Sequence, residues 1–145
     1  MRIYLDMCSL QRPLDSRTQT RIAVEAEAIL NIFDMLESGQ IELTSSQALI
    51  FEAEQITPPV RKTFVTETLS KANLFIPISP SVEEQARIFT NLGIKPLDAL
   101  HLASSVEAKA NYFCTCDDRF LRRAKEADTG NTKVVSILEM IMELD

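Results

Sequence analysis

Short apolar runs rich in β-forming residues alternate with longer helical patterns along the whole chain, and this order of elements restricts the possible folds. The runs predict five strands, at residues 2–5, 41–44, 74–76, 112–115 and 133–135. Short strands that alternate with helices form βαβ units, in which helices cover both faces of a parallel sheet. The sequence therefore predicts an α/β fold, a three-layer α/β/α sandwich with a central parallel sheet of about five short strands.

Several residues mark where the helices begin and end. Gly39 and Gly93 stand where helix C-terminal caps belong, Ser46 is a good N-cap, and Pro96 suits a first helical turn. The segment from residue 9 to about residue 18 is polar and contains a proline, so it predicts a loop. We expect helices at residues 19–38, 47–57, 60–72, 79–92, 96–110 and 117–127, and a last helix from residue 136 onward.

The length of 145 residues, of which 46% are apolar, suits a single domain that spans residues 1–145. No apolar run approaches the roughly 20 residues that cross a bilayer, and the start lacks a long apolar stretch with a cleavage site. We therefore expect a soluble, cytoplasmic protein without membrane contact. Cys114 and Cys116 are poorly placed for a disulfide because one residue separates them, which fits a reducing compartment.

The net charge of −6 argues against a broad, nonspecific grip on nucleic acid, which depends on many cationic contacts to phosphate. It does not exclude a nuclease, because part of the acidic excess belongs to the candidate site described next. Cations recur locally at residues 119–125, where a solvated helix face is the preferred interpretation. Arg12 and Arg119 lie nearest to the candidate acids in sequence, and both phosphate contact and pairing with carboxylates remain open for them.

Four carboxylates stand where strands should end or helices begin. Asp6 and Asp117 each follow a predicted strand, Asp98 falls in the first turn of a predicted helix, and Glu52 lies in the helix after the second strand. Sites in parallel sheets lie outside the carboxyl ends of the strands, so three of the four acids, Asp6, Asp98 and Asp117, could meet at one edge. A cluster of acids repels itself unless a cation lies among them, which favours a site for a divalent metal ion. The alternative is that each acid is a helix cap or a surface charge, which the helix dipole favours for Asp98 and Asp117.

Four segments in this order resemble the PIN-domain family of metal-dependent ribonucleases, which includes the VapC-like toxins of toxin–antitoxin pairs. They are IYLD at residues 3–6, Ser46 with Glu52, LDALHLA at residues 97–103, and YFCTCDDRFL at residues 112–121. The resemblance implies a central parallel sheet between helices, one or two Mg²⁺ or Mn²⁺ ions, and hydrolysis of phosphodiester bonds in RNA. It also implies a cognate antitoxin protein and a homodimer. The segment at residues 11–15 is similar to that of a less studied branch of the family.

The family pattern assigns roles to particular side chains. By resemblance Asp6, Glu52, Asp98 and Asp117 match the first to fourth acids, and we expect Asp6 and Asp98 to bind the metal directly. Glu52 and Asp117 are expected to bind it directly or through water. At Cys8 the chain departs from the pattern, because a small hydroxyl or amide side chain is expected soon after the first acid.

Two acids have close competitors in sequence. Glu54 lies about 200° round the helix from Glu52, so both cannot face one ion, and the spacing from Ser46 favours Glu52. Asp118 competes with Asp117, where the Thr-x-Asp pattern that begins at Thr115 favours Asp117.

Three further side chains are candidates for supporting roles. His101 shares a helix face with Asp98, and we expect it to orient Asp98 by a hydrogen bond or to pack, rather than to act as a general base. Thr115 is a candidate hydrogen-bond partner for an acid or the substrate, and Arg119 is a candidate phosphate contact.

Three functional hypotheses follow. The leading one is a Mg²⁺- or Mn²⁺-dependent endoribonuclease, and the second is a PIN-like scaffold, weak or inactive as an enzyme, that serves to bind a protein partner. The third, a phosphotransfer enzyme or receiver, is disfavoured, because residue 8 is not the second Asp of an Asp-x-Asp phosphatase and only three glycines are present.

Overall fold

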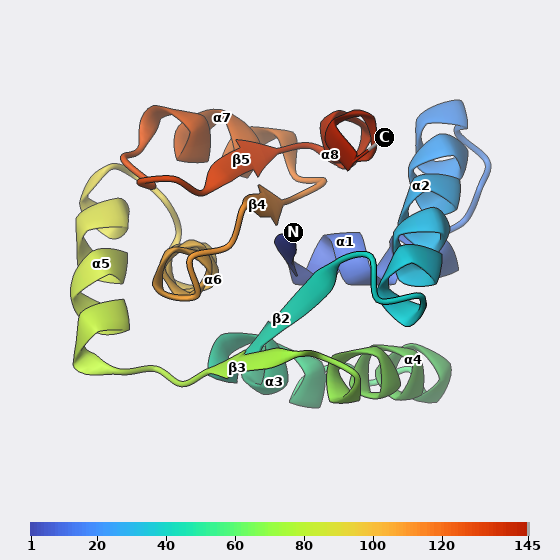
Figure 1. The fold of residues 1–145 in the computed structure, drawn as a ribbon, viewed down its shortest axis with the longest axis horizontal. Coiled ribbons are helices and arrows are strands. Elements are labelled where there is room, and N and C mark those ends of the chain that lie inside the picture. The colour runs from blue at the N-terminus through green and yellow to red at the C-terminus, as the bar shows by residue number, and fades with distance from the viewer. Residues whose placement is uncertain (145) are drawn as a thin grey trace.

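A computed structural model describes residues 1–144 of the protein as an α/β fold built around one sheet (Figure 1). Its strands are β1 (Arg2–Leu5), β2 (Glu42–Ser46), β3 (Leu74–Ile76), β4 (Tyr112–Cys114) and β5 (Lys133–Val135). Its helices are α1 (Met7–Gln11), the 3-10 helix η1 (Arg12–Leu14), α2 (Thr20–Glu37), α3 (Gln47–Glu54), α4 (Pro59–Ser70), α5 (Pro80–Asn91), α6 (Pro96–Glu107), α7 (Asp118–Glu126) and α8 (Ile137–Leu144). Residue 145 lies outside the described part.

The strands form one sheet in the order β3-β2-β1-β4-β5, and every neighbouring pair is parallel. Parallel neighbours need a crossover connection, which the helices between the strands supply. α5 and α6 pack together on one side of the sheet, and α2 and α8 lie together on the opposite side (Figure 1). The predicted α/β sandwich with five parallel strands is therefore confirmed.

The central strand β1 is buried on both faces. Ile3, Tyr4 and Leu5 are each fully buried, and the ring of Tyr4 stacks on Phe113 of β4 with centroids 5.4 Å apart. A strand covered by helices on both faces reads in the sequence as a continuous apolar run, which is what residues 3–5 show. Tyr4 differs from the apolar residues beside it in β1, because its buried hydroxyl needs a hydrogen-bond partner.

The expectation of a loop from residue 9 to about residue 18 is wrong for residues 9–14, whereas residues 15–19 do form a loop before α2. The chain enters α1 directly after β1, and Leu10 of that helix is fully buried. η1 follows at once, with Pro13 in its first turn, where a missing backbone N–H leaves no hydrogen bond unmade. The sequence reasoning treated this proline as a sign of a loop, although a proline also suits the start of a helix.

Other differences concern where elements end. β2 continues to Ser46, which is both the last residue of the strand and the N-cap of α3, with its Oγ accepting a hydrogen bond from the backbone N–H of Leu49. α3 ends at Glu54 and α6 at Glu107, three residues before the predicted ends. Such boundary shifts leave the order and type of the elements unchanged.

A buried carboxylate ties α2 to η1. Glu25 is 2% exposed, and its two oxygens accept hydrogen bonds from Arg12 at 3.0 Å and from Arg21 at 3.3 Å. Arg12 also pairs with Asp15 at 2.9 Å. A buried charge is tolerated when it is paired in this way. Of the two roles considered for Arg12, phosphate contact and pairing with carboxylates, the structure shows the second.

Two further observations concern the chain as a whole. Among residues 1–144, no helix combines the length and apolar character needed to cross a membrane. Cys8, Cys114 and Cys116 are free thiols.

Candidate active site

The four predicted acids line one pocket, although they come from four separate segments. Asp6 follows β1, Glu52 lies in α3 behind β2, Asp98 is in the first turn of α6, and Asp117 follows β4. Because β1, β2 and β4 are parallel neighbours, their carboxyl ends meet at the same edge of the sheet. The complete lining consists of Asp6, Met7, Cys8, Glu52, Asp98, His101 and Asp117.

Asp6 is the most deeply placed of the acids, with 5% of its surface exposed. Its Oδ1 caps α1 by accepting a hydrogen bond from the backbone N–H of Ser9 at 3.1 Å, and it accepts a second one from the thiol of Cys8 at 3.1 Å. Burial raises the pKa of Asp6, and Thr115 first, then the hydrogen bonds from Cys8 and Ser9, partly offset that rise. Cys8 thus supplies a donor to the first acid, whereas the Ser9 hydroxyl donates to the carbonyl oxygen of Cys114 at 3.3 Å.

His101 contacts Glu52, not Asp98. The hydrogen bond predicted to orient Asp98 is therefore wrong in its partner, because the His101 Nε2 lies 2.6 Å from the Glu52 Oε1. The helix spacing correctly placed His101 on the inner face of α6, where it is 1% exposed, but spacing alone could not show that α3 supplies the acid it meets.

The other side of His101 continues into the core. Its Nδ1 lies 2.7 Å from the hydroxyl of Tyr4, which lies 2.6 Å from the Oγ of Ser46. Since the Ser46 Oγ already accepts the Leu49 N–H, its hydroxyl is free to donate to Tyr4, Tyr4 to Nδ1, and Nε2–H to Glu52. Burial raises the pKa of Tyr4 well above its usual value, which keeps the hydroxyl protonated as a donor.

This chain of hydrogen bonds from Ser46 through Tyr4 and His101 to Glu52 was missed by the sequence reasoning. The available signal was Tyr4 itself, a residue with a polar hydroxyl within the apolar run that became the central strand. All four groups are satisfied when the proton of His101 is on Nε2, and in that arrangement the imidazole holds Glu52 in position.

Asp98 shows the mutual repulsion of the acids most directly. Burial, followed by the negative charge of Asp6, raises its pKa to about 6, and the charges of Asp117 and Glu52 act in the same direction. The proximity of His101 lowers it by a smaller amount. A divalent cation in the pocket would remove this repulsion.

Glu54 and Asp118, which compete in sequence with Glu52 and Asp117, do not line the pocket. Glu54 is exposed and does not line the pocket, whereas Glu52 does. Asp118 forms a two-pronged ion pair with Arg21, at 2.7 and 2.8 Å, and this ion pair lowers its pKa. Asp117 lines the pocket and caps α7, since its Oδ1 accepts hydrogen bonds from the N–H groups of Arg119 at 3.0 Å and of Phe120 at 3.1 Å.

Thr115 supports the turn that carries Asp117. Its hydroxyl oxygen accepts a hydrogen bond from the backbone N–H of Asp117 at 3.1 Å, so it holds the turn between β4 and α7. Thr115 is fully buried.

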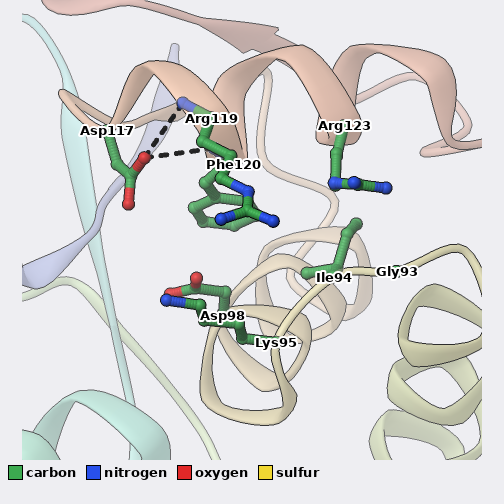
Figure 2. A pocket seen from close by; sticks show the side chains of 8 residues that line it. All are labelled: Gly93, Ile94, Lys95, Asp98, Asp117, Arg119, Phe120 and Arg123. Atoms are coloured by element: carbon green, nitrogen blue, oxygen red, sulfur yellow. Dashed lines mark hydrogen bonds between the residues drawn. The ribbon is translucent and has the colours of Figure 1, made fainter.

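A second pocket adjoins the first and shares Asp98 and Asp117 with it (Figure 2). One wall is α7 with Arg119 and Arg123, and the other is the turn from α5 into α6. The full lining is Gly93, Ile94, Lys95, Asp98, Asp117, Arg119, Phe120 and Arg123. Lys95 was missed by the sequence reasoning, and no local pattern distinguishes it from other surface lysines.

The donor set of the acidic pocket fits a hard divalent cation. Within residues 1–144, no three His, Cys, Asp or Glu side chains are already gathered as a coordination sphere. Mg²⁺ does not require one, because it keeps several waters and typically takes one or two carboxylates together with substrate phosphate. Glu52 and Asp117 each use one oxygen in the hydrogen bonds given above, which leaves the other oxygen for such an ion.

The protein is thus an α/β sandwich with an acidic pocket at the carboxyl edge of its parallel sheet. The PIN domain family model matches residues 18–126, and the chain therefore belongs to the PIN domain family. The resemblance identified from the sequence motifs is confirmed at this level. The matched segment contains Glu52, Asp98 and Asp117, and Asp6 precedes it.

Comparison with solved structures supports the same fold. The crystal structure of VapBC2 from Rickettsia felis bound to a DNA fragment from their promoter contains a chain that aligns with a TM-score of 0.63 and 13% sequence identity. The alignment covers 94% of the present chain and 98% of that chain. At this identity the similarity concerns the fold. A comparison with proteins of curated function finds no match.

Proposed function

We propose that the protein is a Mg²⁺- or Mn²⁺-dependent endoribonuclease that hydrolyses phosphodiester bonds in RNA. The observation that carries this proposal is the convergence of four carboxylates from four segments on one pocket. PIN domains are in general nucleases that depend on divalent metal ions, and membership of that family supports the same reaction class. The raised pKa of Asp98 supports a cation site, because a bound cation would offset the effects of burial and of repulsion, which raise it.

Each side chain has a distinct part in this proposal. Asp6 and Asp98 would hold the ion directly, while Glu52 and Asp117 would bind it directly or through water. When bound, the ion would supply the charge that polarises the scissile phosphate and lowers the pKa of the attacking water. His101 acts through Glu52 as a positioning residue, because its Nε2–H fixes one carboxylate oxygen and so directs the other.

Paired variants test the proposal. The protein should cut single-stranded RNA in Mn²⁺ and stop in EDTA, and both Asp98→Asn and Glu52→Gln should lower the rate by more than about 100-fold. Glu54→Gln is the matched control, because it makes the same chemical change on the same helix outside the pocket. Cleavage without metal, or an equal loss in Glu54→Gln, would contradict the proposal.

The alternative is a PIN-like scaffold that binds a protein partner without cleaving RNA. Titration calorimetry separates the two functions, since the absence of Mn²⁺ binding at millimolar concentration would favour the scaffold. The convergent acids favour the nuclease, because a scaffold has no need to bring like charges together.

We further propose two protein partners. The similarity to a chain of VapBC2 supports a cognate antitoxin, which would cover the acidic pocket by placing a basic side chain in it. The second partner is another copy of the chain, as in the homodimer that the family resemblance implies. Light scattering of the protein alone and with its partner would distinguish a monomer of 16.3 kDa from these assemblies.

A further inference from the structure

The cations of α7 differ from the other arginines in their pairing. Each arginine before α7 forms an ion pair with a carboxylate. Among residues 1–144, no ion pair includes Arg119, Arg122 or Arg123. The chain has 21 acidic and 15 basic side chains, so partners for these three arginines are not scarce. Their lack of ion pairs is therefore a property of this surface.

Two of these arginines gather in the pocket beside the acids. Arg119 and Arg123 are four residues apart, so they lie on one face of α7 and both line the pocket (Figure 2). Lys95 lines the opposite wall and, like them, takes part in none of the ion pairs within the described residues. Ile94 and Phe120 contribute buried apolar surface to the lining. We call this second pocket, whose basic side chains are Lys95, Arg119 and Arg123, the cationic pocket.

The position of Arg123 is built into the fold. Its Nη1 donates a hydrogen bond to the carbonyl oxygen of Leu92 at 3.5 Å, beside the turn that ends α5. Gly93 in that turn has a φ of +92°, and a Cβ there would lie 2.6 Å from the Nη1 of Arg123. The absence of a side chain at residue 93 therefore leaves room for the guanidinium against the backbone.

The cationic pocket lies where a polyanion bound at the acids would continue. It shares Asp98 and Asp117 with the acidic pocket, so a phosphate group next to one bound at the acids lies within reach of its cations. The acids repel phosphate, and a nearby group of cations offsets this repulsion. A guanidinium also presents paired N–H donors whose geometry matches two phosphate oxygens.

We propose that the cationic pocket binds an internal phosphodiester of single-stranded RNA, adjacent to the one that lies at the acidic pocket. The identity of the ligand as RNA rests on the proposed function, whereas the phosphate chemistry rests on the cations themselves. Arg119 and Arg123 contact the phosphate oxygens, and Lys95 adds charge from the opposite wall. The alternative is that these cations only balance the charges of Asp98 and Asp117.

Binding of a short, fluorescently labelled RNA with a 5′-hydroxyl end tests the inference, because such an RNA offers phosphodiesters and no terminal monophosphate at that end. In EDTA, Arg119→Ala and Arg123→Ala should each weaken binding by about 10-fold. Each should also reduce the slope of log affinity against log salt concentration by about 0.7. Arg122→Ala is the matched control, because Arg122 is exposed on the same helix, lies in no ion pair among residues 1–144, and does not line the pocket.

The outcomes separate this inference from the proposed function. RNA binding that depends on Arg119 and Arg123, in a protein that neither binds Mn²⁺ nor cuts RNA, would support the cationic pocket and contradict the nuclease. Cleavage in Mn²⁺ with an equal loss of affinity in all three arginine variants would support the nuclease and overturn the cationic pocket. If the wild-type protein cuts RNA in Mn²⁺, Arg119→Ala and Arg123→Ala should raise KM more than they lower kcat. No measurable RNA binding by the wild-type protein would also overturn the inference.

Discussion

The His101 Nε2 lies 2.6 Å from the Glu52 Oε1, and this hydrogen bond connects an imidazole in the protein core to a carboxylate of the candidate site. His101 is the only histidine of the chain, and both of its ring nitrogens are engaged. The position of Glu52 therefore depends, through His101, on Tyr4 and Ser46, which are fully buried and do not line the pocket. Substitutions in the core should affect the site through this connection.

Tyr4→Phe tests the buried part of the connection. The substitution removes the hydroxyl that donates to His101 and keeps the ring that stacks on Phe113. We expect the free energy of unfolding to fall by about 1–3 kcal/mol, because the Nδ1 of His101 is left buried without a donor. Tyr112→Phe is the control in urea denaturation, since its hydroxyl contacts Glu143 at the surface and its loss should be much smaller. Equal effects of the two substitutions would contradict the buried network.

Asp98→Asn should change how stability depends on pH. The pKa of Asp98 is raised from 3.8 to about 6 in the folded protein, so the folded state binds more protons than the unfolded state between these values. The free energy of unfolding contributed by this group therefore falls as the pH rises from about 4 to about 6, and stays low above that. The metal-free variant avoids this loss.

The measurement is urea denaturation in EDTA across this pH interval. Above pH 6 the variant should be more stable than the wild type by about 1 kcal/mol, a value reduced for the partial exposure of the side chain. Well below pH 3.8 the two proteins should converge, because Asp98 is then protonated in both the folded and the unfolded state. A variant that is less stable than the wild type at pH 8 would contradict the repulsion between the acids.

Asp117→Asn and Asp118→Asn should have opposite consequences. Asparagine is as good an N-cap as aspartate, so Asp117→Asn should keep α7 folded while it removes a charge from the acidic pocket. We expect weaker Mn²⁺ binding with little change in stability. Asp118→Asn should leave Mn²⁺ binding intact and remove the ion pair with Arg21, whose stabilisation the wild type loses as the pH falls through the lowered pKa of Asp118. Titration calorimetry measures the Mn²⁺ affinity of both variants. Weaker Mn²⁺ binding in Asp118→Asn would assign Asp118, instead of Asp117, to the metal site.

Gly93→Ala should disturb the cationic pocket in two ways. A residue with a Cβ at a φ of +92° is strained by about 1–2 kcal/mol, and the new methyl group would displace the guanidinium of Arg123. Gly39→Ala is a matched control, since Gly39 also has a positive φ, of +78°, and a Cβ there meets nothing within 4 Å. Both variants should lose stability, and weaker RNA binding is expected for Gly93→Ala alone. Equal RNA affinity in the two variants would contradict the role of Arg123.

Much of the architecture was predictable because it depends on local patterns. The apolar run at residues 3–5 and the alternation with helices led to the parallel sheet, and the four acids at element junctions led to one pocket. The failed prediction for His101 depended on a contact between distant segments, whereas the one for Pro13 had a local cause. The partner of His101 comes from α3, which packs against α6 in the fold, and no spacing within α6 could identify it. Pro13 was misread because a proline can end one helix or begin another.

Asp6 follows the central strand without any intervening loop. β1 is paired with β4 so that Leu5 lies opposite Cys114, and the backbone N–H of Asp6 donates to the carbonyl oxygen of Cys114 at 3.1 Å. A slip of one residue in this pairing would move the carboxylate by about 3.3 Å and turn it to the other layer. The innermost strand thus sets the depth of the first acid. If the acids hold a metal ion as proposed, substitutions that loosen the packing around this strand should change metal affinity before the protein unfolds.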